Sequence, residues 1–193
     1  MDLKISFKDM ARAELLGVLP TNKDEIIAFL SALSKTCGSI EIVKKRLNLC
    51  LSLDTYDEGV KVVDLFKAIY PAEFELSLEK SKTGGEACTL QVPSGFTKQA
   101  LVDFGLMSVN ADEYLGFIEE LPRDLTGSEK CKIAYFKGLF LGAGSVYVPS
   151  TLDQSEKRDG YHFELQLDDD LFAQDVMELL SDLRINTRMS ERG

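Results

Sequence analysis

The chain has 193 residues, 45% of them hydrophobic and 28% charged, which is the composition of an ordinary globular protein with its own core. Its net charge of −10 argues against strong DNA binding by this chain alone, because duplex DNA attracts proteins chiefly through Lys and Arg. The longest weakly interrupted apolar stretch, Gly138–Val148, is about half the roughly 20 residues of a membrane span, and no signal peptide is recognisable, so we expect a cytoplasmic protein with no membrane partner.

Two helices are predicted at the start of the chain. The first covers about Phe7–Leu19, with Ser6 as its N-terminal cap and Asp9 three residues later. Thr21 and Asp24 form a similar pattern, which predicts the start of a second helix.

A series of strands and helices follows the second helix. The predicted elements are strands at about Ile40–Lys45 and Leu47–Asp54, a helix at Asp57–Tyr70, strands at Phe74–Lys82 and Ala87–Val92, and a helix at Thr97–Met107. Residues 108–128, which Pro122 and Gly127 interrupt, are interpreted as a linker.

The sequence contains an internal repeat. Ala28–Ile40 and Ala134–Val146 match at one constant spacing, and both segments end their helix at Gly-Ser. Small residues recur at every fourth position of each copy, on one helix face: Ala28, Ala32 and Thr36 in the first, and Ala134, Gly138 and Gly142 in the second. Because glycine weakens a helix interior, this pattern predicts that the two helices pack with their backbones close together. We expect the final glycine of each helix to adopt the left-handed conformation.

The second copy is followed by the same order of elements. These are a strand at Val146–Val148, a strand at Tyr161–Leu167, a helix at Asp170–Arg184, and a strand at Ile185–Glu191 that corresponds to residues 74–80. A return strand and a closing helix are missing, so we expect this half to be truncated. The predicted organisation is a first repeat with an N-terminal helix (1–107), a linker (108–128) and an incomplete second repeat (129–193).

These motifs resemble the LAGLIDADG homing endonucleases, most clearly in Phe136–Ser145. More narrowly, Leu121–Leu125, Phe136–Val146 and Leu179–Glu191 are similar to the WhiA family of Gram-positive bacterial regulators. The resemblance implies a mixed α/β (α+β) fold of two pseudo-symmetric αββαββα halves, packed through two central helices. It also implies a role in transcription during sporulation, in cell division and in chromosome segregation. DNA would be bound by a helix-turn-helix domain that this chain does not contain, which would place the full-length protein at the nucleoid.

In active endonucleases of this kind, an acid before the glycine of each repeat helix holds divalent metal for phosphodiester hydrolysis. This chain has Cys37 and Ala143 at those positions, so we expect no catalytic residue, no metal and no cofactor. A displaced site at Glu41 is the weaker alternative. Four scattered cysteines and a single histidine, His162, do not form a zinc motif.

The outward face of the predicted sheets is acidic. The carboxylates on it are Asp54, Glu75, Glu79, Glu164 and Asp168, among polar residues that include Asn48, Ser52, Ser77, His162, Gln166, Asn186 and Arg188. Such a surface repels phosphates and suits a protein, a peptide or a small ligand instead. The leading hypothesis is a non-catalytic protein-interaction or regulatory module of a DNA-binding regulator. The alternatives are a ligand or protein sensor that is not coupled to DNA, and an active endonuclease or a maturase-like RNA partner.

Overall fold

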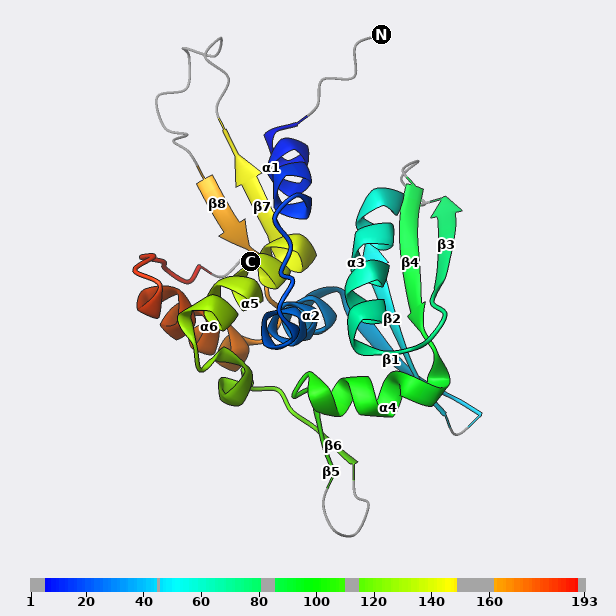
Figure 1. Ribbon diagram of the computed structural model, residues 1–193. Coiled ribbons are helices and arrows are strands. Elements are labelled where there is room, and N and C mark those ends of the chain that lie inside the picture. Colours follow the sequence, from blue (N-terminus) through cyan, green and yellow to red (C-terminus); the bar gives the residue numbers. More distant parts are fainter. Residues whose placement is uncertain (1–5, 45, 81–85, 110–114, 149–161, 191–193) are drawn as a thin grey trace, which may run out of the picture.

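The computed structural model describes residues 6–44, 46–80, 86–109, 115–148 and 162–190. The internal repeat forms two αββα units. Their first helices pack together at the centre of the molecule, and the strands of the two units lie on either side of this pair (Figure 1). Among the described residues, no helix combines the length and the apolar character needed to cross a membrane.

The N-terminal helices begin at capping residues. Helix α1 (Phe7–Leu16) starts at Ser6, whose hydroxyl accepts from the Asp9 amide at 3.1 Å while the Asp9 carboxylate accepts from the Ser6 amide, as predicted. Helix α2 (Lys23–Cys37) is capped by Asn22, which accepts from the Asp24 amide at 3.0 Å. The prediction of Thr21 as the cap is therefore wrong by one residue, because the side chain directly before the first helical turn reaches its free amides.

The first half forms a four-stranded antiparallel sheet with the strand order β1-β2-β4-β3. Its strands are β1 (Gly38–Val43), β2 (Arg46–Leu53), β3 (Glu75–Lys80) and β4 (Glu86–Val92), and its helices are α3 (Tyr56–Ile69) and α4 (Ser94–Asp103). Leu49, Leu51 and Leu53 of β2 are buried in the core, and the residues between them are more accessible. Helix α4 begins three residues earlier and ends four residues earlier than predicted. Beyond it, Gly105 has a φ of +64°, a conformation that favours glycine.

The segment that joins the halves has some regular structure. Strands β5 (Met107–Val109) and β6 (Leu115–Phe117) form a small hairpin, and a 3₁₀ turn, η1 (Arg123–Thr126), leads into the second repeat helix.

The second half repeats the first four elements. They are α5 (Glu129–Ala143), β7 (Gly144–Tyr147), β8 (His162–Leu165) and α6 (Asp170–Asp182), with β7 and β8 antiparallel. The predicted strand at Ile185–Glu191 is wrong for residues 185–190, which are irregular, whereas Glu191 lies outside the described residues. A strand needs a hydrogen-bonding partner, and no described strand lies against this segment.

Helices α2 and α5 pack against each other at the centre of the molecule (Figure 1). Ala28 and Ala32 of α2 are fully buried, and Ala134 of α5 is almost fully buried. A Cβ atom on Gly138 would collide with the backbone carbonyl of Phe29 and lie only 2.9 Å from the Cβ of Ala32. Gly142 lies in the same way against the hydroxyl of Thr36. The two backbones therefore meet where α5 has no side chains.

Both central helices continue directly into strands. Gly38 and Gly144 follow the last helical residues with φ values of −88° and −85°, which are extended and not left-handed. The expectation of left-handed termination is thus wrong. Glycine is needed for a different reason, because a Cβ at Gly38 would collide with the carbonyl oxygen of Ser34, and one at Gly144 would meet that of Phe140.

Gly138→Leu should lower the free energy of unfolding by about 3 kcal/mol, the upper end of the usual cost of overpacking, because the new side chain must push the Phe29 backbone away. Gly95→Leu is the matched control. Gly95 also lies in a helix, but it is exposed and an added Cβ would have no heavy atom within 4 Å, so its effect should stay within about 0.5 kcal/mol. Chemical denaturation measures both. Equal stabilities of the two variants would contradict the close helix contact.

Candidate functional site at the ends of the paired helices

Helices α2 and α5 end at Cys37 and Ala143, the positions at which the resemblance implies metal-binding acids. Ala143 offers only a methyl group, and its backbone carbonyl accepts a hydrogen bond from the Gln166 amide at 3.0 Å. Burial raises the pKa of the Cys37 thiol to about 12. Since the thiolate is the form that attacks electrophiles and binds metals, a neutral Cys37 is suited to neither task.

A buried ion pair lies beside Cys37. Arg12 of α1 is 6% exposed and Glu58 of α3 is 2% exposed. The Nε and Nη2 atoms of Arg12 donate to the two carboxylate oxygens of Glu58, at 2.7 and 3.0 Å. Although burial alone would lower the pKa of Arg12, these hydrogen bonds raise it, so the guanidinium stays charged. The positive charge of Arg12 also lowers the pKa of the Cys37 thiol, but the effect of burial is larger.

The ion pair extends to two more residues at the protein surface. Asp54, at the end of β2, lies 3.4 Å from Arg12 Nη2, and its Oδ2 accepts from Lys8 Nζ at 2.9 Å. The Asp54 amide in turn donates to Glu58 Oε2 at 3.0 Å. These contacts join α1 to the start of α3, and α1 also packs against β7 of the second half (Figure 1). Lys137 of α5 adds a further contact by donating to the Val18 carbonyl, just after α1.

This arrangement is poorly suited to holding a divalent cation. The Arg12 guanidinium already lies among these carboxylates. Asp54 is paired with Lys8, and Glu58 is paired with Arg12. Mg²⁺ needs several oxygen ligands. Within the described part of the chain, no three His, Cys, Asp or Glu side chains gather in a way that could hold a metal ion. Glu41, the displaced alternative, lies exposed on β1 opposite Asn48.

Sequence reasoning did not identify Arg12 and Glu58. One signal was present, because Lys8 and Arg12 are four residues apart in a helix and Asp54 and Glu58 are four residues apart around a helix start. Lys8 and Arg12 therefore lie on one side of their helix, and Asp54 and Glu58 carry the opposite charge. Nothing in the spacing, however, indicates that α1 packs against α3.

The predicted sheet face is accessible in both halves. In the first half Asp54, Glu75 and Ser77 are exposed, whereas the side chain of Glu79 lies outside the described residues. In the second half the exposed members are His162, Gln166, Asp168, Asn186 and Arg188. Glu164 is half-buried, and its Oε2 lies 4.0 Å from His162 Nε2. Carboxylates thus lie on the sheets of both halves.

Comparisons with known proteins agree with this geometry. Residues 132–193 match the family model of the WhiA LAGLIDADG-like domain. The chain is 28% identical over 191 residues to a probable cell division protein WhiA of Halothermothrix orenii, covering 97% of the chain and 57% of that protein. A protein of the same name from Heliobacterium modesticaldum is 26% identical over 192 residues, with 97% and 56% covered. The chain thus spans just over half the length of these curated relatives.

Solved structures show the same fold. The N-terminal LAGLIDADG domain of WhiA superimposes with a TM-score of 0.65 at 20% identity, covering 99% of this chain and 81% of that one. I-DmoI in complex with DNA and Mn gives a TM-score of 0.54 at 13% identity, covering 86% and 81%. The predicted LAGLIDADG-like fold and the predicted resemblance to WhiA are therefore confirmed.

Arg12→Met should lower the free energy of unfolding by about 3–5 kcal/mol, because it leaves the Glu58 carboxylate buried without its partner. The double variant Arg12→Met/Glu58→Leu should recover most of this loss, since apolar side chains replace a buried ion pair at little cost. Denaturation curves of the single and double variants test this.

The control is Lys8→Met, which removes only the exposed ion pair with Asp54 and should cost less than about 1 kcal/mol. If Arg12→Met and Lys8→Met were equally stable, the buried pair would not be the contact that holds α1.

Proposed function

We propose that this chain is the non-catalytic, endonuclease-like part of a WhiA-type DNA-binding regulator of transcription, linked to sporulation, cell division and chromosome segregation. In this proposal the LAGLIDADG fold serves as a protein-interaction or regulatory module, and a helix-turn-helix domain elsewhere in the full-length protein binds DNA. The protein would act in the cytoplasm, at the nucleoid. Relatives that carry the name probable cell division protein WhiA support this assignment.

The observation that carries the non-catalytic role is the chemistry at the ends of α2 and α5. Where a metal-dependent nuclease needs carboxylates, this chain has a methyl group and a neutral thiol. The nearby positive charge is the guanidinium of Arg12, fixed by Glu58. Because the Glu58 and Asp54 carboxylates are already paired with Arg12 and Lys8, they are not available to coordinate a divalent cation at the helix ends.

The sheet face supports a protein partner over DNA. The solved I-DmoI structures include complexes with DNA. Here the exposed Glu75 and Asp168 would each repel a nearby phosphate by roughly 1 kcal/mol. The chain's net charge of −10 adds to this repulsion at longer range. A basic protein surface would instead be attracted.

The chain should not nick supercoiled plasmid in the presence of Mg²⁺ or Mn²⁺. Cys37→Asp combined with Ala143→Asp should also fail to nick, because the acidic sheet face would remain and would still repel the duplex. Gel assays with an active homing endonuclease as the positive control measure this. Metal-dependent nicking by the unmodified chain would overturn the proposal, whereas nicking by the double variant alone would show that only the two acids are missing.

The chain should bind duplex DNA only weakly, with a dissociation constant no tighter than about 10⁻⁴ M, the weak limit of non-specific binding at physiological salt. Fluorescence anisotropy of a labelled duplex at several salt concentrations measures this. Tight binding that weakens steeply as salt is added would show that the acidic face does not exclude DNA.

A further inference from the structure

Helix α1 differs from the other helices in what attaches it to the rest of the chain. Of its ten residues only Arg12, a charged one, is buried. Phe7 and Met10 are 48% and 56% exposed, and Leu15 and Leu16 are half-buried. Each of the other described α-helices buries at least two apolar side chains. Because elements with few buried apolar contacts open at the lowest free energy, α1 is the helix that opens most easily.

The contacts of α1 join the two halves. Arg12 binds Glu58 of the first half through two hydrogen bonds, and the helix packs against β7 of the second half (Figure 1). Just after the helix, the Val18 carbonyl accepts a hydrogen bond from Lys137 of α5 at 2.8 Å. Helix α1 therefore adds a second connection between the halves, beside the contact of α2 with α5.

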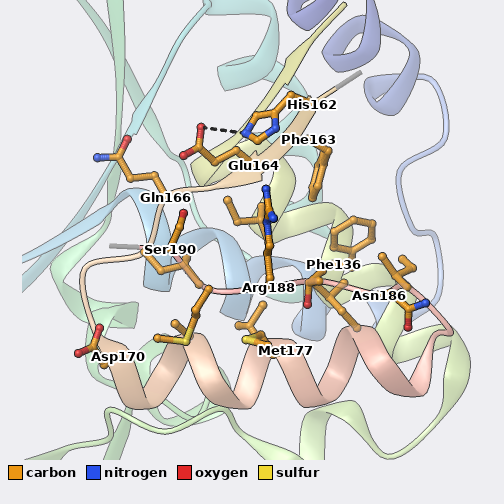
Figure 2. A pocket seen from close by; sticks show the side chains of 18 of the residues that line it. Phe136, His162, Phe163, Glu164, Gln166, Asp170, Met177, Asn186, Arg188 and Ser190 are labelled. Atoms are coloured by element: carbon orange, nitrogen blue, oxygen red, sulfur yellow. Dashed lines mark ion pairs between the residues drawn. The ribbon is translucent and has the colours of Figure 1, made fainter. Parts of the chain in front are cut away.

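The elements that α1 contacts also have contacts of their own. Strand β7 pairs with β8 along its whole length. Phe163 of β8 packs against Phe136 and Phe140 of α5, with ring centroids 5.7 and 5.8 Å apart, and Figure 2 shows Phe163 beside Phe136. In the first half, α3 packs against α2 and against strands β2, β3 and β4. These contacts remain when α1 moves away.

Departure of α1 leaves no charge buried without a partner. Arg12 returns to water with its helix, and Glu58, in the first turn of α3, loses the side chain that pairs with it and becomes accessible. Removing one partner by mutation is costlier, because the other charge then stays buried. Gly17 and Val18 are exposed and lie between α1 and the buried Pro20, so the chain can bend there.

We infer that α1 is a detachable strap, which docks across the two halves and leaves as one unit while the rest of the chain stays folded. Docked, it lies beside Cys37 and covers part of β7. Undocked, it exposes these surfaces and removes its connection between the halves. A molecule that binds only the exposed surfaces would shift the chain toward the undocked state. This property is independent of the role proposed above.

Native-state amide exchange of the 193-residue chain at low urea concentrations tests the strap. An isolated helix of ten residues is marginal in water, so undocked α1 loses its amide protection. We expect residues 10–16 to exchange together, at least about tenfold faster than α2 and α5. Their rates should depend little on urea, because undocking exposes little surface, whereas the rates of α2 and α5 should rise steeply. Equal rates with equal urea dependence would overturn the strap.

A set of variants identifies the contact that docks α1. Arg12→Met should abolish the amide protection of residues 10–16 while α2 and α5 stay protected, because the single variant can avoid a buried unpaired Glu58 by undocking. Arg12→Met/Glu58→Leu should restore the protection through an apolar contact. Lys8→Met, which removes only an exposed ion pair, should change it little. An Arg12→Met chain that keeps α1 protected, or that loses the protection of all helices together, would contradict a detachable strap.

Discussion

The structure depends on the close approach of the α2 and α5 backbones. Gly138 and Gly142 have no side chains where Phe29 and Thr36 lie, so the two helices touch along their main chains. Each helix passes directly into the first strand of its own sheet, and the two halves are therefore placed mainly by this contact. A packed interior tolerates little change in volume. The absence of side chains at Gly138 and Gly142 therefore sets the distance between the two helices, and with it the position of both sheets.

The contact between the helices does not require a metal ion at their ends. Its packing is apolar, and the charged groups that act on Cys37 include a pair, Arg12 and Glu58, that is satisfied within the protein. This pair joins the N-terminal helix to α3 and β2, so it stabilises the arrangement of three elements that are distant in sequence. The central helices thus pack closely in this chain with Cys37 and Ala143, and no acidic residue, as their last residues.

The order of helices and strands could be predicted from the sequence, because hydrophobic periodicity and caps such as Ser6 are local signals. Cys37 and Ala143 were located by the repeat, since it places them at equivalent helix ends. The Arg12–Glu58 pair could not be predicted, because its two residues are 46 positions apart and pair only through the packing of α1. The expected strand at residues 185–190 failed for a related reason. A helix satisfies its own backbone groups, but a strand exists only with a partner, and the sequence of one strand does not indicate whether that partner is present.

The direct passage from helix to strand at Gly38 and Gly144 has a mechanical consequence. No loop separates either helix from its sheet, and the carbonyl oxygens of Ser34 and Phe140 leave no room for a side chain at the junction. Each helix and its first strand should therefore move as one rigid unit, and the contact between α2 and α5 joins the two units. A change in the packing between α2 and α5 would therefore change the relative position of the two sheets without any change in secondary structure.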